Sequence, residues 1–146
     1  MEQTNILIVD DERGVLSSLK RELADEPYNV LCAGGGNEAL KILSENPCKV
    51  IVTDVKMPGM DGFELLAGIK ESYPGVIRVV LSGHSDVRLI LDIVNKGGID
   101  RYLTKPWDIA DVKATIRQCI ELFDLRQEVY ELRKMIKQQG RPDNGG

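Results

Sequence analysis

Residues 5–11 read NILIVDD and residues 49–54 read KVIVTD, so two apolar runs of strand length each stop at an acidic residue. Both runs are rich in Val, Ile and Leu and are bounded by polar segments, which is the pattern of buried strands. Three further runs share this composition. The sequence therefore predicts five buried strands, over residues 5–9, 29–33, 49–53, 76–81 and 99–103.

Longer segments with apolar residues at helical spacing separate these strands, and glycines and prolines occupy the turns. The predicted helices cover residues 15–23, 38–43, 63–72 and 87–95, and a fifth begins near residue 108. Strict alternation of strands and helices indicates a parallel sheet with helices on both faces and right-handed crossovers. The predicted fold class is therefore α/β, a doubly wound (βα)5 three-layer sandwich with an extended C-terminal helix.

The composition of the 146 residues is that of one ordinary globular domain with a modest appendage. The chain has no apolar stretch of the roughly 20 residues that a membrane span needs, and no secretory signal, so we expect a cytoplasmic protein without membrane contact. A net charge of −4 argues against direct nucleic-acid binding. The three cysteines form no C-x-x-C pair, which favours reduced, buried thiols.

Residues with reactive side chains stand at or just after the ends of four predicted strands. Asp10 and Asp11 follow the first strand, Asp54 the third, Ser82 the fourth and Lys105 the fifth. Parallel α/β sheets bind ligands beyond the carboxyl ends of their strands, at the topological switch point. We therefore expect three carboxylates, a hydroxyl and an ammonium group to converge on one edge of the sheet.

This predicted cluster suits phosphoryl chemistry with a hard metal ion. Neighbouring carboxylates repel one another unless a cation offsets their charge, and oxygen ligands with room for phosphate suit Mg²⁺. Asp54 would then be the nucleophile that forms an aspartyl phosphate. Lys105 would neutralise the transferring oxygens, and Ser82 would donate a hydrogen bond to them.

Four motifs, LIVDDE, TDVKMPGMDG, VVLSGHSD and DRYLTKPW, resemble in order and spacing those of the receiver domains of two-component response regulators. The resemblance covers about residues 4–120. It implies a CheY-like, flavodoxin-like sheet of strand order 2-1-3-4-5. It also implies a sensor histidine kinase or a phosphotransfer protein as partner. The implied role is signalling, and the protein would not be a conventional enzyme.

The resemblance also assigns the phosphoryl site. It makes Asp54 the phosphoacceptor and Lys105 its phosphate-pairing cation, and it gives Mg²⁺ four ligands: Asp10, Asp11, Asp54 and the backbone carbonyl of Lys56. Taken alone, Asp10 and Asp11 have an ordinary alternative as N-capping residues of the following helix. Their coincidence with the other strand-end residues favours the functional interpretation.

The resemblance further implies a switch and two tuning residues. Ser82, an accepted variant of the more frequent Thr, and Tyr102 are the switch residues, although an aromatic on a strand is usually part of the core. Lys56 and His84 are hypothesised to set the lifetime of the phosphoryl group, although a lone histidine is more often a solvated loop residue. Pro106 often follows a cis bond in this family.

The predicted C-terminal helix carries two successive apolar stripes. Ile109, Val112, Ile116 and Cys119 suit packing on the sheet, and a second stripe then begins one position out of phase. Alternating three- and four-residue steps in the second stripe predict a parallel two-stranded coiled coil, and hence a homodimer. The predicted seam consists of Leu122, Leu125, Val129, Leu132 and Ile136.

The charges beside this seam agree with a parallel dimer. Glu121 and Glu128 at heptad position g face Arg126 and Arg133 at position e of the partner helix. The alternative is that two and a half heptads are too short to hold a dimer alone. We expect a receiver domain over residues 1–120, a helical extension over 121–139, and a disordered tail or linker over 140–146.

Two other functions compete with the phosphoacceptor receiver. A haloacid-dehalogenase-like phosphatase also uses an aspartyl nucleophile, a Ser or Thr, a Lys and Mg²⁺, but it carries the nucleophile on the first strand. The second alternative is a dimeric interaction module that works without phosphorylation. We also expect either a fragment of a longer regulator, whose effector domain follows the coiled coil, or a complete single-domain protein.

Overall fold

Strands and helices alternate along the computed structural model, which describes residues 3–83, 86–95 and 98–139. The strands are β1 (Asn5–Val9), β2 (Asn29–Ala33), β3 (Val50–Thr53), β4 (Ile77–Ser82) and β5 (Arg101–Thr104). The helices are α1 (Arg13–Glu22), α2 (Gly36–Glu45), α3 (Gly62–Ser72), α4 (Val87–Asn95) and α5 (Ile109–Gln139). All ten elements were predicted, with bounds that differ by no more than two residues.

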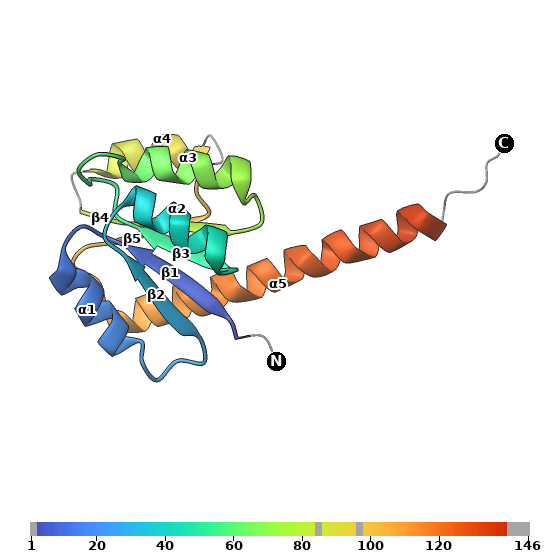
Figure 1. Ribbon diagram of the computed structural model, residues 1–146, viewed down its shortest axis with the longest axis horizontal. Helices are drawn as coiled ribbons and strands as arrows, with labels where there is room; N and C mark the ends of the chain where they lie inside the picture. Colours follow the sequence, from blue (N-terminus) through green and yellow to red (C-terminus); the bar gives the residue numbers. More distant parts are fainter. Residues whose placement is uncertain (1–2, 84–85, 96–97, 140–146) are drawn as a thin grey trace.

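The five strands form one parallel sheet in the order β2-β1-β3-β4-β5. Helices α2, α3 and α4 cover one face of this sheet, and α1 and α5 cover the other (Figure 1). The flavodoxin-like three-layer architecture and its strand order are therefore confirmed. Because β1 and β3 are central neighbours, the residues that follow them lie side by side at the same edge.

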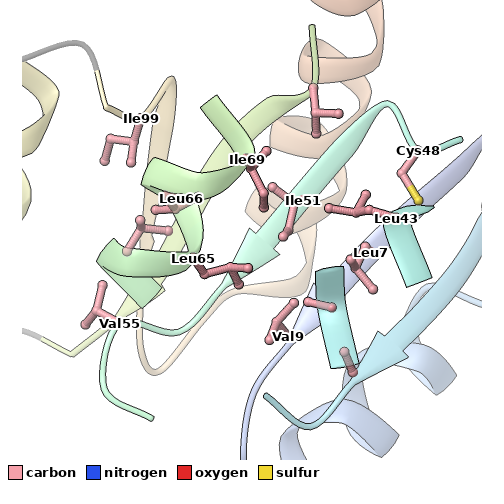
Figure 2. Close-up of a cluster of buried hydrophobic side chains, with 14 of the residues drawn as sticks. Leu7, Val9, Leu43, Cys48, Ile51, Val55, Leu65, Leu66, Ile69 and Ile99 are labelled. Atoms are coloured by element: carbon pink, nitrogen blue, oxygen red, sulfur yellow. The ribbon is translucent and has the colours of Figure 1, made fainter. Parts of the chain in front are cut away.

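Alternation of side chains along the strands produces two separate cores. Leu7 and Val9 of β1 belong to the apolar cluster beneath α2, α3 and α4, part of which is drawn in Figure 2. Ile6 and Ile8 of the same strand belong to the cluster shared with α1 and α5. Successive strand residues point to opposite faces, so a strand with helices on both sides must be apolar throughout.

The prediction that all five strands are buried is wrong for β5. This strand lies at the edge of the sheet, and its first two residues, Arg101 and Tyr102, are exposed. The central strands β3 and β4 are buried along their whole length. An edge strand has a neighbour on one side only, which leaves part of its surface to the solvent.

Helix α5 packs against the domain along only part of its length. Val112, Ile116 and Cys119 are its buried residues, and beyond them the helix extends away from the body of the domain (Figure 1). None of the helices that the structure describes has the length and apolarity of a membrane span. The thiols of Cys48 and Cys119 are free and buried as predicted, whereas Cys32 is only partly buried.

Candidate functional site

The register of the sheet places the predicted site residues next to one another. Val9 pairs with Thr53, so Asp10 and Asp54 follow neighbouring strand ends. Ser82 pairs with Thr104, the last residue of β5, so Lys105, which follows β5, lies next to the end of β4. Residues separated by up to 95 positions in sequence therefore meet at the carboxyl edge of the sheet, as predicted.

Three carboxylates form the acidic part of this site. Asp10, Asp11 and Asp54 each offer one oxygen, and these oxygens lie within 4.8 Å of one another. Asp10 is 1% exposed, whereas Asp11 is exposed. An all-oxygen cluster that is open on one side fits a hard divalent cation such as Mg²⁺, which keeps several of its waters.

Neither Asp10 nor Asp11 is the N-cap of α1. Glu12 occupies the N-cap of α1 and makes no side-chain cap hydrogen bond. The Asp10 carboxylate instead accepts the Glu12 N–H at 2.9 Å, which fixes the loop that leaves β1. Asp10 and Asp11 are thus left facing the site.

Lys105 lies between two of the carboxylates. Its Nζ is 3.1 Å from Asp10 Oδ2 and 3.4 Å from Asp54 Oδ2. Burial alone lowers the pKa of Lys105, but hydrogen bonds to Asp10 and Asp54 and attraction to their charges outweigh it and raise the pKa above its ordinary value. The ammonium group is therefore a permanent cation of the site. The peptide bond from Lys105 to Pro106 is cis, as expected.

Asp54 is the central carboxylate of the cluster. Its Oδ1 accepts the Val55 N–H at 2.8 Å, and its Oδ2 faces Lys105. Burial raises the pKa of the Asp54 carboxyl above its ordinary value; Lys105 opposes this, and the charge of Asp10 adds to it. The ionised, nucleophilic form is thus costly here, so an added cation would stabilise it.

Ser82 has a buried hydroxyl without a partner. The residue is 0% exposed, and its Oγ finds no hydrogen-bond partner within the described part of the chain. An unsatisfied buried hydroxyl is costly, and a new acceptor near it would remove that cost. The Ser82 carbonyl accepts the Lys105 N–H at 2.8 Å, which joins the ends of β4 and β5.

Of the two residues predicted to set the phosphoryl lifetime, Lys56 and His84, the structure describes only Lys56. Lys56 lies in the loop after β3, and its ammonium pairs with Asp86 at 3.2 Å. Within residues 3–83, 86–95 and 98–139, no ion pair joins Lys56 to Asp54. His84 lies outside the described residues.

Tyr102 and four of the five predicted seam residues are exposed. Tyr102 is 44% exposed on β5, so the alternative that it belongs to the core is wrong. Leu122 is half-buried, where α5 leaves the domain. The other four seam residues are large, exposed hydrophobic side chains: Leu125, Val129, Leu132 and Ile136.

The fold and the acidic site agree with comparisons to known proteins. The family model of the response regulator receiver domain matches residues 6–117. The chain belongs to this family. It is therefore a receiver domain of two-component signalling. Such domains are signalling modules and generally not conventional enzymes. The haloacid-dehalogenase alternative has no support from this family or from the position of Asp54 after β3.

Relatives of this receiver domain include much longer regulators. The hydrogenase transcriptional regulatory protein HoxA of Cupriavidus necator is 37% identical over 130 residues, which are 89% of this chain and 27% of HoxA. The DNA-binding transcriptional regulator NtrC of Salmonella typhimurium is 31% identical over 128 residues, 88% of this chain and 27% of NtrC. The chain thus spans about a quarter of the length of these curated relatives.

A solved receiver domain has the same fold. The signal receiver domain of an HD domain-containing protein from Pseudomonas fluorescens Pf-5 is 34% identical, with a TM-score of 0.81. The similarity covers 88% of this chain and 94% of that one.

Sequence reasoning missed two residues of the receiver site. Asp86 is 4% exposed and holds Lys56, but an acid before a helix resembles any N-terminal helix residue in sequence. Gly62 opens α3, and a Cβ there would collide with the Asp54 carbonyl oxygen. The Asp-Gly pair at 61–62 was a signal for this close approach, because only glycine permits it.

Proposed function

We propose that this receiver accepts a phosphoryl group on Asp54 from a sensor histidine kinase or a phosphotransfer protein. One observation carries the proposal: the Lys105 ammonium lies between the Asp10 and Asp54 carboxylates at the carboxyl edge of the sheet. A cation held there by protein carboxylates is placed to neutralise the oxygens of a phosphoryl group.

The transfer replaces one bond to phosphorus by another. An Asp54 carboxylate oxygen forms the new bond, and the bond from phosphorus to the imidazole nitrogen of the donor histidine breaks. The imidazole keeps the electron pair and takes a proton from solvent. Lys105 offsets the charge on the transferring oxygens, and the Ser82 hydroxyl, which has no partner within residues 3–83, 86–95 and 98–139, donates to one of them.

Mg²⁺ fits the carboxylate cluster as the cofactor of this reaction. Asp10, Asp11 and Asp54 would hold it, together with the backbone carbonyl of Lys56. When bound, Mg²⁺ supplies positive charge next to the phosphoryl oxygens. Lys56 and His84 are proposed, in addition, to set the lifetime of the phosphoryl group.

The output of the switch is proposed to be a dimer. An acceptor on Asp54 would draw the Ser82 hydroxyl toward it, and Tyr102 on the neighbouring strand would change position with the connection between β4 and α4. The exposed α5 seam, Leu125 to Ile136, supports a parallel coiled coil with a second copy of the chain. In a longer regulator, α5 would lead into an effector domain, consistent with the length of HoxA and NtrC.

Incubation with acetyl phosphate and Mg²⁺, followed by intact mass measurement, tests the phosphoacceptor. A single added phosphoryl group that is absent in Asp54→Asn supports the proposal. Rapid multiple turnover would instead indicate a phosphatase. Absence of any adduct would favour the interaction module that works without phosphorylation.

Size measurement tests the dimer separately. Leu132→Ser removes an apolar residue from the seam, whereas Lys134→Ser, two residues later on the outer face, keeps the seam intact. The dimer should dissociate in the first variant and persist in the second. Equal masses for both variants would contradict the coiled coil.

A further inference from the structure

An ion pair crosses from the loop after β3 to the start of α4. Lys56 Nζ lies 3.2 Å from Asp86 Oδ1. The two partners differ in exposure, since the Lys56 side chain is 71% exposed and that of Asp86 only 6%. A buried carboxylate is costly without a cation, whereas an exposed ammonium group is solvated by water. Loss of the ion pair would therefore destabilise Asp86 more than Lys56.

The position of Lys56 gives it a second potential partner. It follows the phosphoacceptor by two residues, and its four-carbon stem allows the ammonium group to change direction. In this structure the ammonium group contacts Asp86, and Lys105 is the cation that contacts Asp54. Any anion that arrives at Asp54 therefore competes with Asp86 for Lys56.

We propose that Asp86 is a positioning residue that holds the Lys56 ammonium away from Asp54 and so slows phosphoryl transfer from anionic donors. The inference rests on the proposed phosphoacceptor function and adds a residue to it. Asp86 acts through Lys56 and does not touch the reacting atoms. It immediately precedes Val87, the first residue of α4, so release of Lys56 would also leave the start of α4 with an unpaired carboxylate.

Ser82 is a second residue, close to Asp86 in sequence, whose contacts phosphorylation would change. Ser82 ends β4 with a buried hydroxyl that has no partner among the described residues, and Asp86 stands four residues later. A phosphoryl group on Asp54 would offer an acceptor to Ser82 and an anion to Lys56. Both changes act on the segment between β4 and α4, and Asp86 opposes the second of them.

The rate constant for phosphorylation of the full chain by acetyl phosphate and Mg²⁺ tests this inference. Asp86→Asn should raise it about fivefold, a size typical of coupling between paired residues. Asp86→Glu keeps the charge and should stay within about twofold of the wild-type rate, which is below that coupling. Lys56→Met removes the ammonium group that Asp86 holds and leaves the backbone carbonyl in place, so it supplies the background in which the effect of Asp86 should disappear.

The decisive comparison is Asp86→Asn in a Lys56→Met background. No rise in rate there, together with the rise in the wild-type background and unchanged Mg²⁺ affinity by calorimetry, supports a role through Lys56. The same rise in both backgrounds would mean a general field effect and would overturn the inference.

Other outcomes separate this inference from the proposed function. An unchanged rate in Asp86→Asn would overturn only the role of Asp86. If Asp86→Asn does not fold, Asp86→Ala removes the same buried charge and provides the same comparison in both backgrounds. A wild-type chain that takes no phosphoryl group would overturn the proposed function, and this inference with it.

Discussion

Gly62 shows how closely the backbone is packed around the phosphoacceptor candidate. A Cβ at this position would collide with the Asp54 carbonyl oxygen and the Val55 Cα. Gly62→Ala should therefore destabilise the fold by about 1–3 kcal/mol, as overpacking does, and slow phosphorylation because Asp54 is displaced. Urea unfolding and the acetyl phosphate rate measure the two effects.

Gly68 on the same helix provides the matched control. A Cβ there meets nothing within 4 Å, and the position is inside α3. Gly68→Ala should stabilise the protein by about 0.5–1 kcal/mol, because alanine is the better helix former. Equal effects of the two substitutions would contradict the close approach at Gly62.

Asp54 should make the stability of the metal-free protein depend on pH. Its folded pKa is raised from 3.8, mainly by burial, so between the two values the folded state binds more protons than the unfolded state. Stability from this group therefore increases as the pH falls through the raised pKa toward 3.8. Asp54→Asn lacks this dependence.

Urea unfolding of both proteins at several pH values, with a chelator present, measures the difference. Asp54→Asn should be more stable than the wild type at neutral pH, and the gap should narrow as the pH falls. Added Mg²⁺ should narrow the gap as well, because it stabilises only the wild-type cluster. A gap that is independent of pH would show that burial of the Asp54 charge carries no cost.

The residues of the site differ in how far the sequence could predict them. Asp10, Asp54 and Lys105 stand at strand ends, and strand ends of a parallel sheet meet at one edge, so their convergence follows from topology. The contact of Lys56 with Asp86 follows from the paths of two loops, and no periodicity encodes such paths. Tyr102 was ambiguous because its exposure depends on β5 lying at the sheet edge.

At the scale of elements, α5 combines two roles in one helix. Its first part covers the sheet, and Ile116 is fully buried there. Its later part carries the exposed seam, to which Leu132 belongs. The change of stripe in the sequence predicted this division, because a shift in helical phase turns the apolar face toward a different neighbour.

Alanine substitutions should separate these roles. Ile116→Ala should lower the free energy of unfolding by about 2–5 kcal/mol, because it opens a cavity in the core. Leu132→Ala should change the stability of the monomer by less than about 0.5 kcal/mol, as exposed positions do. It should instead weaken the dimer about tenfold or more, which sedimentation at several concentrations measures. Loss of monomer stability in Leu132→Ala would place this residue in an intrachain contact.

Two ion pairs join α5 to the domain where the helix leaves it. Lys49 pairs with Asp124 at 2.7 Å, and Arg126 pairs with Asp100 at 3.3 Å. Arg126 was expected at heptad position e, opposite Glu121 of a partner. In this structure it binds Asp100 directly before β5, a contact between distant segments that heptad positions cannot reveal.

For the whole molecule, β5 links the two ends of the receiver. Asp100, just before the strand, contacts the emerging α5, and Lys105, just after it, contacts the acidic cluster. The seam and the phosphoacceptor candidate therefore lie at opposite ends of the sheet, but one strand of four residues separates their contacts. A shift of β5 on phosphorylation would change the contacts of both Asp100 and Lys105. Tyr102 lies between these two residues on β5, so it would move with the strand.

The orientation of the proposed dimer can be tested with an added thiol. In a parallel coiled coil both copies of position 136 meet, so Ile136→Cys should form a disulfide-linked dimer under mild oxidation at pH 8. Burial raises the pKa of the native Cys48 and Cys119 thiols to about 11, so they stay protonated and unreactive. The Cys32 pKa is also raised.

Lys134→Cys, on the outer face of the same helical turn, is the control, and it should crosslink much more slowly on a non-reducing gel. Equal rates for the two variants would mean random collision and not a seam. An antiparallel pair, in which position a packs against position d of the partner, would place position 136 beside position 125 of the other chain. In that case Ile136→Cys would fail to crosslink alone and would crosslink when mixed with Leu125→Cys. Because the two receiver bodies lie at the same end only in the parallel pair, this result decides whether both phosphoacceptor sites act on one dimer from the same side.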